Sequence, residues 1–137
     1  MQHRRHPVVR AVAPVLLVRD VVASANYFRD KLGFTYDRLW NEPPDFCMVR
    51  RDGHTVMLSQ APPGARLVPH WKVVRQMWNA YFWVDDVEAM FAEFRRRGAI
   101  IDYELTTKPY GVREFGVQDL DGHDLAFGQI LGFSAET

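Results

Sequence analysis

The side chains that could do chemistry are scattered along this chain of 137 residues, and they form no known catalytic pattern. Cys47 is the single cysteine, so an intrachain disulfide is excluded, and its apolar surroundings favour a buried, inert thiol. His3 and His6 could together catch a metal ion, but no second histidine pair completes a site. No Ser/His/Asp or Cys/His group has the required context, and the glycines occur at turns rather than in a phosphate-binding loop.

Charged side chains offer candidates for acid–base work or ligand binding by their location alone. Glu42, Asp45 and Glu114 could act as general acids or bases, although ordinary surface carboxylates are the simpler interpretation. Arg75 and Arg113 could grip an anionic or polar ligand, because a guanidinium presents a rigid fork of donors. For Arg113, a structural ion pair with a nearby carboxylate is the alternative.

Aromatic side chains are abundant, with nine Phe, five Tyr and four Trp. Four of them lie in polar surroundings that core packing does not explain: Trp40, Trp71, Trp78 and Tyr110. Flat rings stack on planar ligands, each adding about 0.5–1.5 kcal/mol beyond simple burial. These rings could therefore wall a pocket for a flat, partly apolar molecule, if the fold provides one. His70 is placed near that pocket, whereas His54 and His123 follow turn glycines and are expected to be exposed.

The overall charge is balanced, with 17 basic and 17 acidic side chains. A neutral chain gives no electrostatic reason to expect nucleic acid or an anionic membrane as a partner. No long apolar run follows the arginines near the N-terminus, so neither a signal peptide nor a membrane span is expected, and the predicted location is the cytoplasm. The length suits one domain with a sizeable core.

An internal repeat supplies the elements that must position these side chains. Residues 18–23 (VRDVVA) recur as residues 84–89 (VDDVEA), and Phe28-Arg29 recurs as Phe94-Arg95. Asp52-Gly53-His54 recurs as Asp121-Gly122-His123, and at the same spacing Phe46 aligns with Phe115. The matches keep the same order in both halves, which predicts two copies of one structural module.

Each half predicts the element order β-α-β-β-β. The first half has a strand at 15–18, a helix from the N-cap Asp20 to Gly33, and strands near 35–39, 45–50 and 55–60, with a type I′ turn at Asp52-Gly53. The second half has a strand at 80–84, a helix at 87–97, and strands near 100–104, 114–117 and 124–129. We predict one domain over residues 14–130, comprising modules 14–60 and 79–130 joined by a linker at 61–78, and an N-terminal arm of residues 1–13.

Two stretches carry a family resemblance: residues 18–34 (VRDVVASANYFRDKLGF) and residues 110–129 (YGVREFGVQDLDGHDLAFGQ). They resemble the glyoxalase/bleomycin resistance protein/dioxygenase (vicinal oxygen chelate) superfamily, and the second is most similar to the closing stretch of bleomycin-resistance proteins. The resemblance implies an α+β fold in which two tandem βαβββ modules form a cup-shaped mixed sheet. It also implies a ligand site on the concave face and a homodimer.

Metal-dependent members of that superfamily hold one divalent cation with two side chains from each module. Carried over through the repeat, the first-strand positions are Ala13 and Asn79, and the last-strand positions are Met57 and Ala126. Methyl groups cannot coordinate a metal, the thioether of Met57 is soft, and a lone amide is a weak ligand. The resemblance therefore predicts no metal and no cofactor here.

Strand alternation and the resemblance together give the predicted site. The predicted ligand-binding residues are Trp40, Phe46, Met57, Ser59, Trp71, Trp78, Asn79, Tyr81, Tyr110, Arg113 and Phe115. The favoured hypothesis is a metal-independent protein that binds a small molecule, for instance an antibiotic, without catalysis. One alternative is a divergent metal-dependent lyase, isomerase or dioxygenase with ligands elsewhere. Another is a structural or regulatory protein whose cup is vestigial.

Overall fold

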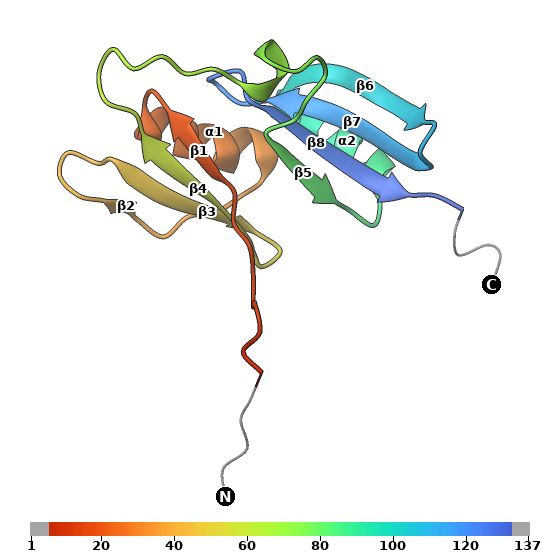
Figure 1. The fold of residues 1–137 in the computed structure, drawn as a ribbon, viewed down its shortest axis with the longest axis horizontal. Coiled ribbons are helices and arrows are strands. Elements are labelled where there is room, and N and C mark those ends of the chain that lie inside the picture. The colour runs from red at the N-terminus through yellow and green to blue at the C-terminus, as the bar shows by residue number, and fades with distance from the viewer. Residues whose placement is uncertain (1–5, 133–137) are drawn as a thin grey trace, which may run out of the picture.

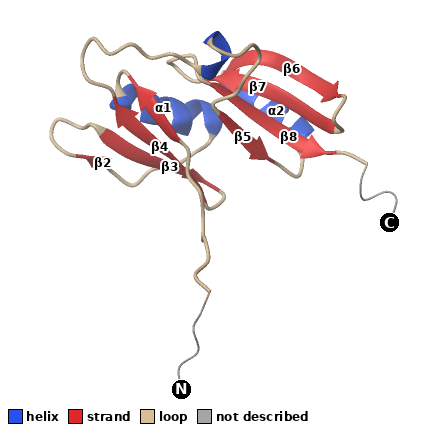
Figure 2. Cartoon of the chain, viewed as in Figure 1, coloured by secondary structure: helices blue, strands red, loops and turns tan. Residues whose placement is uncertain are grey.

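A computed structural model describes residues 6–132 and shows two βαβββ modules side by side (Figures 1 and 2). The first comprises β1 (Val15–Val18), α1 (Val21–Leu32), β2 (Leu39–Trp40), β3 (Phe46–Arg51) and β4 (His54–Gln60). The second comprises β5 (Ala80–Trp83), α2 (Val87–Arg97), β6 (Ile100–Lys108), β7 (Val112–Gln118) and β8 (Asp124–Ile130). Between them lies the short 3-10 helix η1 (His70–Lys72). The predicted α+β, two-module fold is confirmed.

The mixed sheet is divided into two four-stranded sheets with equivalent topology. Their strand orders are β1-β4-β3-β2 and β5-β8-β7-β6, with the first strand of each module parallel to the last. Each helix covers one face of its own sheet and leaves the other face open (Figure 2). The described part of the arm runs away from both sheets (Figure 1). Neither α1 nor α2 has the length and apolar composition of a membrane-spanning helix.

The helices begin and end where the sequence predicts. The carboxylate of Asp20 accepts from the N–H of Ala23 at 3.1 Å, and Asp86 does the same for Ala89 at 3.1 Å. Gly33 ends α1 with φ 72°, a left-handed conformation that costs glycine little. Repeated capping chemistry therefore builds the repeated helices.

The turns and strand ends differ more between the modules. Asp52 and Gly53 both have positive φ, as a type I′ turn requires. The strand expected at 35–39 is reduced to β2 and one isolated bridge between Thr35 and Arg50. β6 is longer than expected and reaches Lys108, because it pairs with β7 beyond two irregularities that flank Tyr103.

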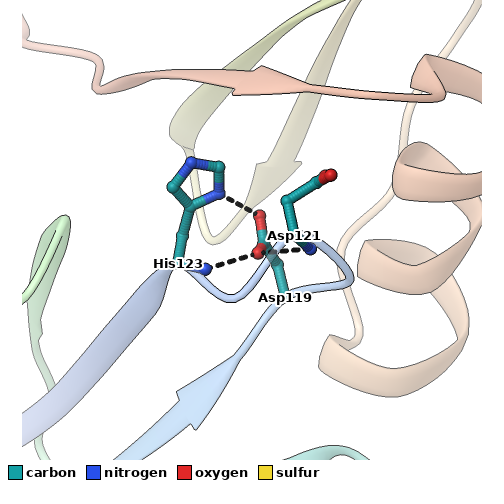
Figure 3. A group of neighbouring side chains, drawn as sticks. All are labelled: Asp119, Asp121 and His123. Carbon is teal, nitrogen blue, oxygen red and sulfur yellow. Dashed lines mark hydrogen bonds and ion pairs between the residues drawn. The ribbon is translucent and has the colours of Figure 1, made fainter. Parts of the chain in front are cut away.

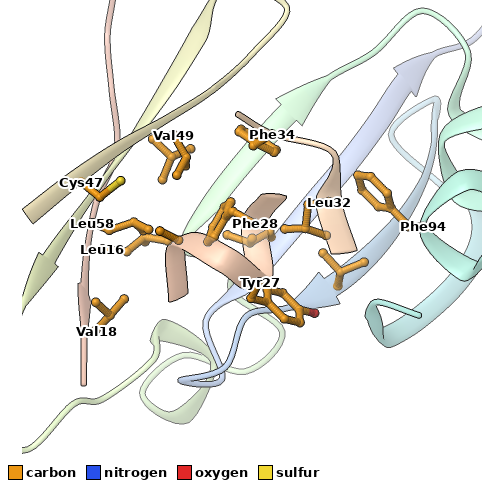
Figure 4. Close-up of a cluster of buried hydrophobic side chains, with 14 of the residues drawn as sticks. Leu16, Val18, Tyr27, Phe28, Leu32, Phe34, Cys47, Val49, Leu58 and Phe94 are labelled. Carbon is orange, nitrogen blue, oxygen red and sulfur yellow. The ribbon is translucent and has the colours of Figure 1, made fainter. Parts of the chain in front are cut away.

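The two modules share one apolar core, part of which Figure 4 shows around α1. Phe28 and Phe94 are fully buried, and Phe34 of the first module contacts Phe82 of the second edge-on, with ring centroids 6.3 Å apart. Cys47 is fully buried there, as expected, and burial raises the pKa of its thiol to about 11.

Polar contacts reinforce the junction between the modules. Arg51 donates to both carboxylate oxygens of Glu93 at 2.8 Å, and this pairing holds the pKa of Glu93 at about 2. The hydroxyl of Tyr27 donates to the carbonyl of Gln118 at 2.6 Å and accepts from the N–H of Ile100 at 2.9 Å. α1 is therefore tied to the second module by both packing and hydrogen bonds.

Candidate functional site

The open face of the second sheet is the candidate site. Leu125, Phe127, Phe115 and Val117 point to the helix and are buried in the core. The alternate residues of β7 and β8 point to the other face, where Glu114 lies opposite Gly128 and Gly116 lies opposite Ala126. Three of these four residues are glycine or alanine, so aromatic side chains from neighbouring segments can lie close against this face.

A buried carboxylate lies on this face with three phenol groups around it. Glu114 is fully buried, and its Oε1 accepts from the hydroxyls of Tyr81 at 2.7 Å and Tyr110 at 2.8 Å. Its Oε2 accepts from the hydroxyl of Tyr103 at 2.5 Å. Trp78 extends the network by donating its Nε1–H to the Tyr103 oxygen at 3.0 Å. Hydrogen bonds to a carboxylate are stronger than those between neutral groups, so this network fixes four aromatic side chains.

Burial and the neighbouring carboxylate also keep the phenols protonated. Burial, and then the hydrogen bond to Glu114, raise the pKa values of Tyr81 and Tyr103 far above the usual 10.0. The same two causes raise the pKa of Tyr110 to about 12. The three tyrosines are therefore hydrogen-bond donors at neutral pH and not bases.

Two glycines let the tyrosines reach Glu114. A Cβ on Gly116 would collide with the ring of Tyr103, and a Cβ on Gly128 would collide with the hydroxyl of Tyr81. Both glycines lie within strands, where their lack of a side chain permits close approach rather than an unusual backbone. The rings consequently lie close against the sheet.

A second acidic group lies toward the other end of the same face. Asp124 is 4% exposed, and no hydrogen-bond donor among the described residues reaches its Oδ1. Burial, followed by the adjacent carboxyl of Asp102, raises the pKa of Asp124 to about 7. Asp124 is therefore a buried acid whose charge is incompletely compensated.

A cavity of ≈ 680 Å³ connects these groups. Its lining comprises Arg75, Gln76, Trp78, Asp102, Tyr103, Glu104, Thr106, Lys108, Tyr110, Glu114 and Asp124. A second cavity of ≈ 710 Å³ lies between the modules, with Phe34, Phe82 and Trp83 in its wall. We favour the first as the site, because buried polar groups converge in it and polar groups of this kind orient a ligand.

The raised pKa of Asp124 makes a prediction about pH. A carboxyl whose pKa in the folded state lies above its ordinary 3.8 takes up a proton on folding. Its contribution to the free energy of unfolding is therefore most favourable at low pH. That stability falls as pH rises from 3.8 to about 7 and then levels off. Asp124→Asn removes this loss of stability. The melting temperature of the variant, relative to that of the wild type, should therefore rise by at least about 2 °C between pH 3.8 and about 7.

Thermal melts at a series of pH values check this expectation. Asp37→Asn is the matched control, because the Asp37 side chain is 90% exposed, and its melting temperature should run parallel to that of the wild type. A difference between Asp124→Asn and wild type that stays constant over the whole pH range would contradict the prediction.

Of the residues predicted for ligand binding, the structure brings three together at Glu114: Trp78, Tyr81 and Tyr110. Two others hold the linker in place. The side-chain oxygen of Asn79 accepts from the N–H of His70 at 3.1 Å, and Trp71 donates to the carbonyl of Gly122 at 2.7 Å. The ring of His70 in turn lies 3.0 Å from the carbonyl of Trp78.

The predicted residues of the first module form a separate surface. Trp40 pairs with Phe46, and Phe46 pairs with Ser59, on the face of the first sheet that α1 leaves open. Met57 lies on the same face, opposite Met48. None of the four predicted residues Trp40, Phe46, Met57 and Ser59 lines the cavity around Glu114.

Two predicted residues are occupied by other contacts. Phe115 is fully buried and stacks on Phe127, with ring centroids 5.5 Å apart, so it cannot face a ligand. The prediction for Phe115 was wrong because of the register of β7. In the first module Phe46 pairs with Ser59. In the second module the residue equivalent to Ser59 is Gly128, and it pairs with Glu114 instead of Phe115. Such a shift by one residue turns a side chain to the other face of the sheet.

Arg113 forms an ion pair with Glu88 at 2.9 Å, as the alternative interpretation expected.

Sequence reasoning missed Tyr103, Asp102 and Asp124, and it treated Glu114 as a surface group. The signal that could have found Glu114 is its place in a strand whose next alternate position is Gly116, opposite small residues of β8. Tyr103 had no such signal, because the irregularities on either side of it break the alternation of β6.

His123 also differs from expectation, since it is only 5% exposed. Its Nδ1 lies 2.7 Å from Asp119 Oδ2, while Asp119 Oδ1 accepts from the N–H groups of Asp121 and His123 (Figure 3). The potential ligand atoms of these three residues lie within 4.8 Å of one another. Both oxygens of Asp119 already have partners, so the group is a hydrogen-bonded loop that joins β7 to β8. His54 is exposed as predicted, and His3 lies outside the described residues.

The residues at the four metal-ligand positions do not fit a metal. Ala13 and Ala126 offer no donor atom, and Ala126 is fully buried. The oxygen of Asn79 is already bonded to the linker backbone, and Met57 offers only a thioether. A divalent cation of the kind bound by metal-dependent relatives would find no suitable ligand set there.

Comparison with solved structures places this architecture among known proteins. The bleomycin-binding protein of Streptomyces verticillus, solved with copper(II)-bleomycin, is 26% identical, with a TM-score of 0.66 over 93% of this chain and 99% of that one. TnmS3, an antibiotic-binding protein of Streptomyces sp. CB03234, is 16% identical, with a TM-score of 0.69 over 92% and 99%. A glyoxalase-related enzyme of Clostridium phytofermentans is 19% identical, with a TM-score of 0.72 over 93% and 100%.

No curated protein sequence matches this chain significantly. The family model of the Glyoxalase/Bleomycin resistance protein/Dioxygenase superfamily matches residues 8–127, which include both modules and the linker. Since the match runs through nearly the whole described chain and the two-module fold agrees with it, this protein belongs to the glyoxalase/bleomycin resistance protein/dioxygenase superfamily.

Proposed function

We propose that this protein binds a small, flat, partly apolar molecule, of the kind represented by aromatic antibiotics, in the cavity around Glu114, without a metal and without catalysis. One observation carries the proposal: a fully buried carboxylate, held by three tyrosine hydroxyls, lies in the wall of a ≈ 680 Å³ cavity. Such a cavity combines aromatic walls for stacking with fixed polar groups that orient a ligand.

The choice of binding over catalysis is supported by the residues themselves. The positions that hold the metal in metal-dependent relatives carry Ala13, Met57, Asn79 and Ala126, which do not form a ligand set. The tyrosines are locked as donors to Glu114, and this arrangement supplies orientation rather than a free base. Two similar structures are of proteins that bind bleomycin and an antibiotic, respectively, which supports a small-molecule ligand here.

A divergent metal-dependent lyase, isomerase or dioxygenase is the alternative function, and no observation favours it. Elemental mass spectrometry of untagged protein purified without chelator separates the two. A stoichiometric transition metal would contradict metal-independent binding. The homodimer and the cytoplasmic location stay predictions.

Trp78→Ala is expected to weaken binding of a flat aromatic probe by about 10-fold or more, because Trp78 lines the cavity and tryptophans in a binding site contribute strongly to affinity. The probe is acridine, titrated by calorimetry. Trp40→Ala is the matched control, since Trp40 lies on the first sheet and outside the cavity. We expect it to bind acridine as the wild type does.

The opposite pattern, with binding lost in Trp40→Ala and kept in Trp78→Ala, would place the site on the first sheet. If no member of a panel of flat aromatic compounds raises the melting temperature of the wild type, the binding function itself is rejected, because a ligand of the folded state must stabilise it.

A further inference from the structure

The charge of the cavity indicates the class of ligand, and this inference rests on the proposed function. Four acidic side chains line the cavity: Asp102, Glu104, Glu114 and Asp124. Two basic side chains, Arg75 and Lys108, line it as well. Acidic groups are therefore in excess, although the chain as a whole is neutral.

The acidic groups differ in how well they are satisfied. Glu114 accepts three hydroxyl hydrogen bonds, and Glu104 pairs with Arg95 at 3.2 Å on the exposed side of β6. Asp124, by contrast, is buried, lines the cavity and has an oxygen that no donor of the described residues reaches. Its neighbour Asp102 is a second carboxyl, which favours a proton rather than a charge on Asp124, and the side chain of Gln118 favours the charged form only in part. A buried carboxyl in this state is stabilised by a cation.

The cavity already contains a cation from the chain itself. The ammonium of Lys108 lies 5.3 Å from the ring centre of Tyr103, a distance at which the electron-rich face of the ring attracts it. Tyr103 is held in place by Glu114 and Trp78, so its exposed face is a fixed surface for a positive charge. The Lys108 side chain is long and only partly buried, so it can leave this position.

The separation of the two acidic ends suits a flat ring system. Glu114 lies opposite Gly128, four residues along β8 from Asp124, which is about 13 Å at 3.3 Å per residue. Between them the sheet carries Gly116 and Ala126, with the ring of Tyr103 against Gly116. Ala126 is fully buried and Tyr103 covers Gly116, so the ring of Tyr103 forms the apolar surface of the cavity here, with Trp78 and Tyr110 in the wall.

We propose that the cavity takes a flat molecule that carries an ammonium or amidinium group, which replaces the Lys108 ammonium on Tyr103 and pairs with Asp124. Lys108 is then an internal competitor that occupies the cation position when no ligand is bound. The aromatic part of the ligand lies in the cavity beside Trp78 and Tyr110, toward the tyrosines around Glu114.

Three probes of matched shape test the charge preference in mildly alkaline buffer: 9-aminoacridine as the cation, acridine as the neutral compound and acridine-9-carboxylate as the anion. We expect the wild type to bind 9-aminoacridine about 10-fold more tightly than acridine, and the anion most weakly. Asp124→Asn should remove most of this preference, whereas Asp37→Asn, outside the cavity, should keep it. Lys108→Met should raise the affinity for 9-aminoacridine about 3-fold or more.

Asp102→Asn provides a second test of the acidic end if Asp124→Asn perturbs folding, and Asp37→Asn is the control for the substitution itself. Equal affinities of the wild type for the cation and the neutral compound would overturn the cation inference and leave small-molecule binding intact. A preference that survives in both Asp124→Asn and Asp102→Asn would also overturn it. If none of the three probes binds, the cation inference is overturned, and the proposed function fails with it if the panel of flat aromatic compounds also leaves the melting temperature of the wild type unchanged.

Discussion

Glu114→Gln is expected to lower the free energy of unfolding by about 3 kcal/mol and to abolish tight binding in the cavity. The substitution keeps the shape of the side chain but replaces one acceptor oxygen by an amide nitrogen, which can only donate. That nitrogen would face tyrosine hydroxyls that now donate to Glu114 at 2.5–2.8 Å. At least one buried polar group would lose its partner, and the remaining hydrogen bonds would lose the carboxylate charge that strengthens them.

Urea denaturation followed by circular dichroism measures this effect. Glu42→Gln is the matched control, because Glu42 is exposed in the first module, and its effect should stay within about 0.5 kcal/mol. A Glu114→Gln protein as stable as the Glu42→Gln protein would show that the tyrosine network contributes little, and the argument for an ordered cavity would fail.

Gly128→Ala is expected to cost about 2 kcal/mol of stability and to displace Tyr81 from Glu114. The added methyl group would collide with the Tyr81 hydroxyl, and its distance to a methyl carbon of Val112 would be only 2.9 Å. Both neighbours lie close against the strand, so relief requires Tyr81 to rotate away and its hydrogen bond to Glu114 to break.

A double-mutant cycle with Tyr81→Phe checks the cause. Tyr81→Phe removes the colliding hydroxyl, so Gly128→Ala should cost less in that background, with a coupling of about 1 kcal/mol. Additive effects of the two substitutions in urea denaturation would mean that the alanine acts on the ring of residue 81, on Val112 or on the backbone, and not through the tyrosine hydroxyl.

Local chemistry in the sequence determined much of the fold. The aspartate N-caps and the glycine ends of α1 and α2 act within a few residues, and Asp52-Gly53 forms its turn from the same local preference. The repeat predicted both modules, because equivalent residues meet equivalent surroundings. The open face of β8 was also predicted, since Ala126 and Gly128 occupy the same register as Met57 and Ser59.

Only the tertiary structure decided the candidate site. The repeat aligned Phe115 with Phe46, but residues 119–123 join β7 to β8 in place of the tight Asp52-Gly53 turn, and β7 is paired one residue out of the aligned register. That single shift places Phe115 in the core and Glu114 on the open face. The irregularities of β6 then bring Tyr103 over Gly116, and Tyr110 arrives from the turn before β7.

There is a physical reason why the sequence predicts the helices and turns but not the candidate site. Caps, turns and amphipathic helices depend on interactions between near neighbours, which the order of residues displays directly. The Glu114 network joins side chains from the end of the linker, β5, β6, the β6–β7 turn and β7, and its geometry depends on strand register and on the space left by two glycines. Strand register is set by pairing between segments distant in sequence, so a single chain predicts the sheet but not which side chains meet on its open face.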